Sequence, residues 1–141
     1  MTAGHGVKAH ENWVNIFGDW WKKQFPQSQL TLQNGAVPAV GTGYMSVCYG
    51  EHIDADADVV ITEFAINENR SDESATTYEL LLRQLLLLPK QPAVLNLQVF
   101  ALVFPTITRG GDVHTAVAQY YGEWWMFCGC RSLLTLHQTR L

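Results

Sequence analysis

The sequence has few cysteines, few basic residues and no long apolar run, and each shortage excludes a class of protein. Its three cysteines (Cys48, Cys128 and Cys130) cannot all pair within one chain and are too few for a disulfide scaffold. Nine Lys and Arg residues against 13 Asp and Glu give a net charge of −4, so nucleic-acid binding is not expected. Every apolar run is far shorter than the roughly 20 residues of a membrane span, so none is predicted. The opening residues contain no apolar signal region, and the compartment stays open.

The composition that remains is that of a folded domain. Of the 141 residues, 48% are hydrophobic and 16% are charged, which is typical of a globular protein. This length is sufficient for one domain with a hydrophobic core and is too short for two domains that would each have one. The sequence does not indicate an oligomeric state.

Periodicity predicts alternating helices and strands. An amphipathic helix over 11–25 carries a heavy aromatic face (Trp13, Phe17, Trp20, Trp21 and Phe25), which its spacing predicts to be core, and Pro26 stops it. Further elements are a short strand at 30–33, a helix at 44–52, a strand from Asp58, a helix from a cap at Asp72 or Ser74 to Leu88, a strand at 93–104 and a helix at 112–121. Strict alternation predicts an α/β fold with a parallel sheet covered by helices on both faces.

The strand from Asp58 is followed by a polar segment with candidate chemistry. Its run Val-Val-Ile-Thr favours a strand buried on both faces, and Asn67 follows its carboxyl end. In open α/β sheets ligands bind outside the carboxyl ends of strands, so the Asn67 amide is a candidate functional group. The alternative is that Asn67 only starts a turn or caps the next helix.

Two other motifs do not support a bound cofactor or metal. Gly41-x-Gly43 lacks the third glycine and the βαβ context of a dinucleotide fingerprint. Cys128-x-Cys130 with His137 has neither the usual zinc spacing nor a fourth ligand. We therefore expect no cofactor and no metal, and Cys48 is predicted to be a small buried apolar residue.

Three segments, taken in order, resemble the SGNH-type (GDSL-like) ester hydrolase superfamily. They are 1–7 (Met-Thr-Ala-Gly-His-Gly-Val), 34–39 (Asn-Gly-Ala-Val-Pro-Ala) and 58–68, and Ala-Gln-Tyr-Tyr at 118–121 is typical of one branch. The resemblance implies a three-layer α/β/α, flavodoxin-like fold, incomplete here, over residues 1–121. Residues 122–141 would form a divergent tail rich in Trp, Cys and Leu.

The resemblance also implies a site. The family's Gly-x-Asn-Asp block corresponds to Ala65-Ile-Asn67-Glu68, so Asn67 would donate its side-chain amide into an oxyanion hole. The family's second donor, a glycine N–H, corresponds to Ala39, with Gly41 as a near neighbour. Such donors can each lower the barrier by about 2.7 to 4 kcal/mol.

The nucleophile and the base do not match the family. Its serine directly precedes a segment like Met1-Thr2-Ala-Gly, so the serine and its strand are expected to lie before Met1. His114 has one residue, not two, between it and Asp112, and His137 has Leu134 where the family has Asp. Thr2 is the only hydroxyl near the missing serine. His5 and His10 are expected to be solvated loop residues.

The sequence therefore predicts an SGNH-type esterase domain that keeps the oxyanion-hole segments and has weak or no activity as written. Its partner would be a small acyl ester or an acylated carbohydrate. The alternatives are a non-catalytic carbohydrate- or protein-binding domain, or a truncated gene product.

Overall fold

The computed structural model describes residues 2–99, 111–122 and 124–128. Helices and strands alternate along the chain, with α1 at Trp13–Gln24, α2 at Thr42–Cys48, β1 at Val59–Thr62, α3 at Asp72–Leu86, β2 at Ala93–Val99, α4 at Gly111–Tyr120 and β3 at Trp124–Cys128. Two 3-10 turns, η1 (Ala9–Glu11) and η2 (Tyr49–Glu51), precede α1 and follow α2.

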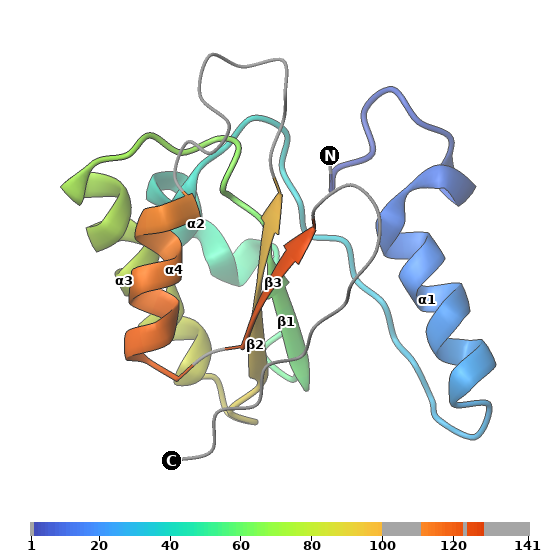
Figure 1. The fold of residues 1–141 in the computed structure, drawn as a ribbon. Coiled ribbons are helices and arrows are strands. Elements are labelled where there is room, and N and C mark those ends of the chain that lie inside the picture. Colours follow the sequence, from blue (N-terminus) through green and yellow to red (C-terminus); the bar gives the residue numbers. More distant parts are fainter. Residues whose placement is uncertain (1, 100–110, 123, 129–141) are drawn as a thin grey trace.

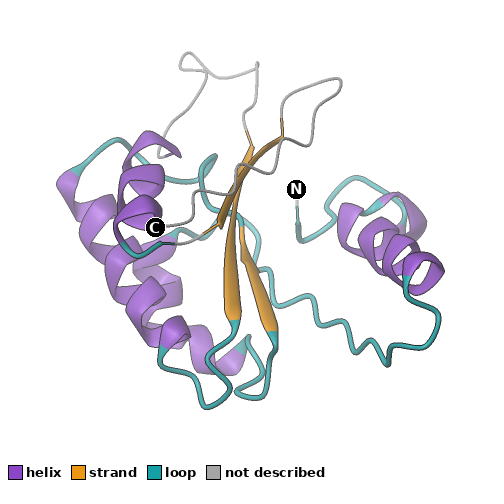
Figure 2. Cartoon of the chain, turned by 60° about the horizontal axis from the view of Figure 1, so that its bottom comes forward, coloured by secondary structure: helices purple, strands orange, loops and turns teal. Residues whose placement is uncertain are grey.

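The three described strands form one parallel sheet in the order β1-β2-β3 (Figures 1 and 2). Val60 lies beside Val94 and Thr62 beside Asn96, and Leu95 lies beside Trp124. Helices α2, α3 and α4 cover one side of the sheet, and α1 lies on the other (Figure 1). The predicted α/β fold, an incomplete three-layer α/β/α arrangement with a parallel sheet, is confirmed.

The core lies between the sheet and α3. Tyr78, Leu81, Leu82 and Leu85 of α3 are almost completely buried and pack with other buried apolar residues of the cluster, among them Val60 and Val94. The apolar stripe on α3 is therefore explained by packing on the sheet.

Local signals place the helix ends. The Asn12 side chain accepts a hydrogen bond of 2.9 Å from the Val14 N–H and caps α1, and Lys22 and Lys23 lie in its last turn, where cations suit the helix dipole. The cap of α3 is Ser71, which accepts from the Ser74 N–H at 3.2 Å. The prediction of Asp72 or Ser74 as this cap was wrong, because the hydroxyl at position 71 reaches the third residue of the helix.

The strand predicted at 30–33 is wrong, since these residues have no regular structure. Leu32 instead reaches α1, where its side chain would lie 2.8 Å from a Cβ added at Gly18. In the part of the chain that is described, no strand pairs with this segment, so its backbone has no ladder to join.

The prediction that the aromatic face of α1 is core is also wrong for two of its residues. Trp20 is 49% exposed and Phe25 is 47% exposed. These rings pack mainly on each other and on Trp21, with centroids 4.7 Å apart for Trp21 and Phe25. Spacing predicted the apolar face correctly, but within the described part of the chain Trp20 and Phe25 keep about half of their surface exposed.

Strand β1 is only half buried, which differs from the predicted two-sided burial. Val60 and Thr62 point into the core, whereas Val59 is 48% exposed. Strand β3 falls within the segment that the sequence assigned to a tail, and it pairs with β2. The division of the chain at residue 121 stays a prediction.

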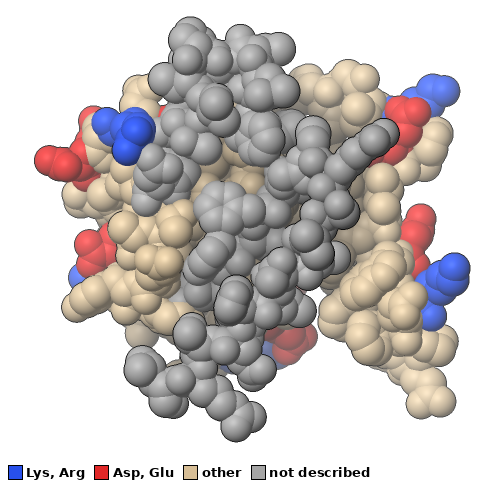
Figure 3. All heavy atoms as spheres, viewed as in Figure 1, with Lys and Arg blue, Asp and Glu red and all other residues tan. Residues whose placement is uncertain are grey.

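On the face shown in Figure 3, acidic and basic side chains lie mainly at the two sides, over α1 and over the helices of the α3 and α4 layer. None of the helices in the described part of the chain has the length and hydropathy needed to cross a lipid bilayer.

Candidate functional site

Two loops meet at the carboxyl end of β1. The first follows β1 and carries Asn67, and the second runs from Asn34 to Gly41 ahead of α2. The exposed side chain of Asn67 donates a hydrogen bond of 2.9 Å from Nδ2 to the carbonyl of Val40. One N–H of the amide is used in this bond, and the second makes no hydrogen bond to the described residues. The structure therefore places a carboxamide donor beside the backbone of Ala39 and Val40.

Ala39 has a backbone conformation that an alanine rarely adopts. Its φ is +58°, in the left-handed region that glycine occupies freely. A non-glycine residue here costs about 1 to 2 kcal/mol, so the loop around Ala39 must hold it in place. The resemblance puts a glycine at this position in the family.

Glu68 is a buried carboxyl group that ties the same two loops together. Its side chain is 7% exposed, and Oε1 accepts from the backbone N–H of Thr42 and from the Thr42 hydroxyl at 2.8 Å. Oε2 accepts from the Ser74 hydroxyl, also at 2.8 Å. The carboxyl thus accepts from a backbone N–H at the start of α2 that has no partner within the helix, and from a side chain in the first turn of α3.

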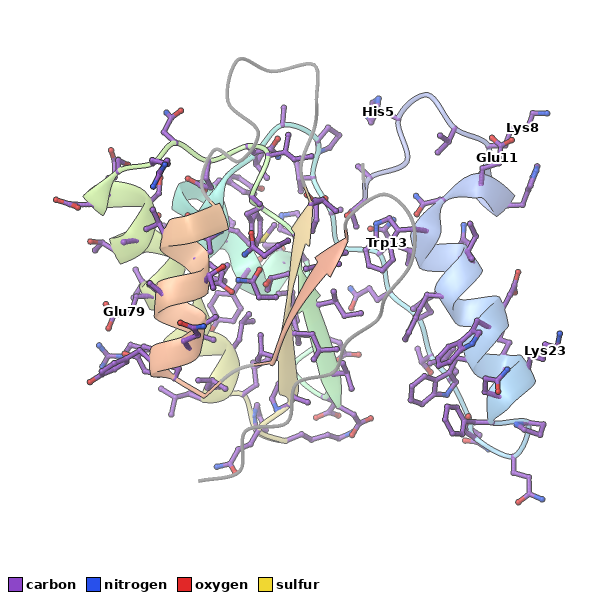
Figure 4. The ribbon with its side chains drawn as sticks, viewed as in Figure 1. His5, Lys8, Glu11, Trp13, Lys23 and Glu79 are labelled. Carbon is purple, nitrogen blue, oxygen red and sulfur yellow. The ribbon has the colours of Figure 1, made fainter. Side chains whose placement is uncertain are left out.

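A second polar cluster anchors the N-terminal segment. The Thr2 hydroxyl donates to Glu63 Oε2 at 2.8 Å and accepts from the indole N–H of Trp13 at 3.0 Å. Figure 4 shows Trp13 on the side of α1 that faces the sheet. The Thr2 carbonyl accepts from the side-chain amides of Asn12 and Asn34, at 3.0 and 2.9 Å.

Burial raises the pKa of the Glu63 carboxyl, and the hydrogen bond from Thr2 partly opposes this shift. Glu63 directly follows β1, so this cluster joins the N-terminal segment to the strand that leads to Asn67.

His114 lies inside the protein rather than at the site surface. It is 0% exposed and its ring stacks on Tyr78 with centroids 4.2 Å apart. Burial lowers its pKa to about 4, and the nearby Glu68 opposes the shift. Within the described residues neither ring nitrogen has a hydrogen-bond partner. A neutral imidazole enclosed in this way is a core residue, which agrees with its poor match to the family's base.

The other histidines and the cysteines considered from the sequence lie outside the two loops or outside the described residues. His5 and His10 are exposed in the N-terminal segment, as expected of solvated loop residues. Cys48 is a free thiol at the end of α2 and is only partly buried, so it is more exposed than the predicted small buried residue. The described residues contain no group of three or more potential metal ligands. The side chains of Cys128 and Cys130, and His137, lie outside what the structure describes.

Two hollows on the described surface lie away from Asn67. One of about 280 Å³ is lined by residues of α1 and by Leu30 and Leu32. The other, of about 730 Å³, is lined by Glu79, Arg83 and residues of α4. Neither contains the donor groups of the two loops, so the chemistry of the loops is the better guide to a site.

Sequence reasoning named Asn67 and Ala39 as candidates, and this assignment stays a prediction, but it did not anticipate the contacts of Glu68 and Glu63. Glu68 entered only as a departure from the family's Asp, and Glu63 was read as one member of a strand. A carboxyl group in a mostly apolar stretch was the available signal for Glu63, because a buried carboxyl requires partners, whereas Glu68 lies in a polar run that gives no such signal.

No protein-family model matches the chain, and no curated protein matches it. Among solved structures, a two-domain esterase active on acetylated mannans superimposes with a TM-score of 0.82 and 25% identity, over 89% of this chain and 34% of that one. A structure of such an esterase co-crystallised with mannopentaose gives 0.80 and 25%, over 89% and 35%. The chain therefore spans about a third of the length of a carbohydrate esterase and has the fold of that part.

Proposed function

We propose that this chain carries the oxyanion-hole part of an SGNH-type ester hydrolase that acts on acylated carbohydrates. The observation that carries the proposal is the hydrogen bond from Asn67 Nδ2 to the Val40 carbonyl. It brings together the two segments that the resemblance assigns to the oxyanion hole. The structural likeness to an esterase active on acetylated mannans supports the reaction class and the substrate class.

The chemistry follows from two donors in one place. When a hydroxyl attacks an ester carbonyl, the carbonyl oxygen becomes negative and needs donors at about 3 Å. The second N–H of the Asn67 amide and the backbone N–H of Ala39 would supply them from two loops. The Val40 carbonyl fixes the carboxamide orientation, so that the amide does not have to reorganise as charge develops.

The positive φ of Ala39 supports the same assignment. In the left-handed region the peptide N–H points away from the direction it takes in an extended loop, and the family uses glycine for this purpose. An alanine that accepts the conformation keeps the donor while paying a steric cost.

Turnover by this polypeptide is expected to be slow. The sequence contains no Gly-Asp-Ser or Gly-Gly-Ser turn, so the donors have no matching serine nucleophile within these residues. Substrate binding does not need that nucleophile and is expected to remain.

The test compares Asn67→Ala with the matched control Asn69→Ala, which changes an exposed asparagine of the same loop. Binding of acetylated manno-oligosaccharide is measured by calorimetry, and hydrolysis of p-nitrophenyl acetate is measured above the buffer rate. An oxyanion donor acts in the transition state, so Asn67→Ala should lower hydrolysis by about 100-fold or more and leave binding nearly unchanged. Hydrolysis that survives Asn67→Ala would show that the amide has no such role.

A second candidate is a non-catalytic carbohydrate-binding domain, and the missing serine turn favours it. Saturable binding without any hydrolysis in the wild type would select this candidate. Absence of both binding and hydrolysis would rule out the carbohydrate substrate in either form.

A further inference from the structure

The two loops of the proposed site are joined by more than the Asn67 amide. Glu68, the next residue, turns inward from the same loop and is buried, whereas Asn67 is exposed. Adjacent residues of one loop thus bind two nearby points, Val40 in the second loop and Thr42 at the start of α2. Ala39 directly precedes these points, so its backbone position depends on both.

The Glu68 carboxyl accepts three hydrogen bonds in a buried site. It lies in a site where the Thr42 N–H, the Thr42 hydroxyl and the Ser74 hydroxyl all donate to it. Ser46 and Met45 of α2 and Tyr78 of α3 are buried in the same layer. Removing a buried acceptor leaves its donors unpaired, which costs about 1 to 3 kcal/mol for each group.

Gly41 provides the space that this carboxyl needs. A Cβ built at Gly41 would collide with Glu68 Oε1 and lie only 3.0 Å from Cδ. The φ of Gly41 is −105°, which any residue adopts, so backbone freedom does not require glycine here. Close approach of the Glu68 side chain does require it.

We propose that Glu68, with Gly41, is the positioning element of the oxyanion hole. The carboxyl sets the distance between the Asn67 loop and the backbone from Ala39 to Thr42, and so aims both donors at one point. The positioning role of Glu68 rests on the proposed function. The hydrogen bonds by which Glu68 links the two segments do not depend on that function, because they are part of the fold. In this chain the glutamate at position 68 fits because position 41 carries no Cβ.

The linkage is tested without any ester. In Glu68→Asp the carboxyl is one methylene shorter and should no longer reach the Thr42 N–H. Hydrogen exchange of that N–H should become at least about tenfold faster, and the side-chain amide resonances of Asn67 should shift in a ¹H–¹⁵N spectrum. Glu68→Gln keeps an acceptor at Oε1 and should restore both readouts. Glu73→Ala, at an exposed carboxyl in the first turn of α3, is the matched control and should change neither.

The pairing of Gly41 with Glu68 is tested by a double-mutant cycle. Gly41→Ala alone should lower the melting temperature because the new methyl meets the carboxyl. The Gly41→Ala/Glu68→Asp variant should melt at or above the temperature of Gly41→Ala, because the shorter side chain leaves room. Additive losses would overturn the proposed fit, and unchanged Thr42 exchange in a folded Glu68→Asp protein would overturn the linkage.

The effect of Glu68 on hydrolysis can be tested separately from its effect on the structure. If p-nitrophenyl acetate hydrolysis depends on Asn67, Glu68→Asp should lower kcat by about tenfold with KM unchanged, and Glu68→Gln should recover it. Hydrolysis that depends on Asn67 but not on Glu68 would overturn the positioning role while leaving the proposed function standing. Altered Thr42 exchange with hydrolysis independent of Asn67 would overturn the proposed function and leave only the structural linkage standing.

Discussion

Protonation of His114 should destabilise the fold in a defined pH window. Its pKa is lowered from 6.5 to about 4, first by burial, against the opposing effect of Glu68. The folded state therefore resists taking up a proton that the unfolded chain accepts. Stability from this group is complete above pH 6.5 and is lost as the pH falls from 6.5 towards 4.

The size of this effect follows from the two pKa values. A shift of about 2.5 in pKa corresponds to about 3 to 4 kcal/mol at most, since one pKa unit is worth about 1.4 kcal/mol. At pH 5 the folded state should have lost about 2 kcal/mol of its free energy of unfolding relative to pH 8. That is a large part of the total stability expected of a small domain.

The assay is urea unfolding followed by far-UV circular dichroism at pH 5, 6, 7 and 8. His114→Phe keeps a ring that can stack on Tyr78 and removes two buried nitrogens that have no partner within the described residues. This variant should be as stable as the wild type or more stable at pH 8 and should lack the fall towards pH 5. In the control His10→Gln, at an exposed ring, the fall should persist. An equal fall in His114→Phe would refute the assignment to His114.

Two further substitutions test other features of the loops. Ala39→Gly should raise the free energy of unfolding by about 0.5 to 1 kcal/mol, because relief of the left-handed strain exceeds the added entropy of the unfolded chain. Gln91→Gly, at the other non-glycine residue with a positive φ, should have the same effect. A lower free energy of unfolding in both variants would contradict the proposed strain. The pKa of Glu63 is raised in the folded state, so its contribution to the free energy of unfolding is complete below about pH 4.5. That contribution is lost as the pH rises through the pKa of the folded state. Glu63→Gln should therefore gain stability relative to wild type as the pH rises to 7, measured by thermal melts across pH; a constant difference at all pH values would contradict the shift.

Much of the fold could be predicted from sequence because its signals are local. The apolar stripe of α3 and the caps and charges at the ends of α1 act within a few residues. They placed these helices to within one or two positions. The alternation of helices and strands then favoured a parallel sheet.

The features that sequence reasoning missed depend on distant partners. Helix α2 begins at Thr42 because Glu68, 26 residues later in the chain, accepts its first N–H. The segment at 30–33 has the pattern of a strand, and it contacts α1 instead of a ladder. In the same way the Asn67 amide could be named from the family pattern, but its contact with Val40 could not.

The attachment of α1 affects how unfolding of this protein will be observed. Three of its five tryptophans (Trp13, Trp20 and Trp21) lie in this helix. Among the described residues the helix contacts the rest of the chain through the Thr2 cluster and at Gly18, and Trp20 and Phe25 of its aromatic face are about half exposed. An element held by so little buried surface opens at a lower free energy than the sheet. Tryptophan fluorescence will therefore report mainly the release of α1, and circular dichroism the loss of the α/β core.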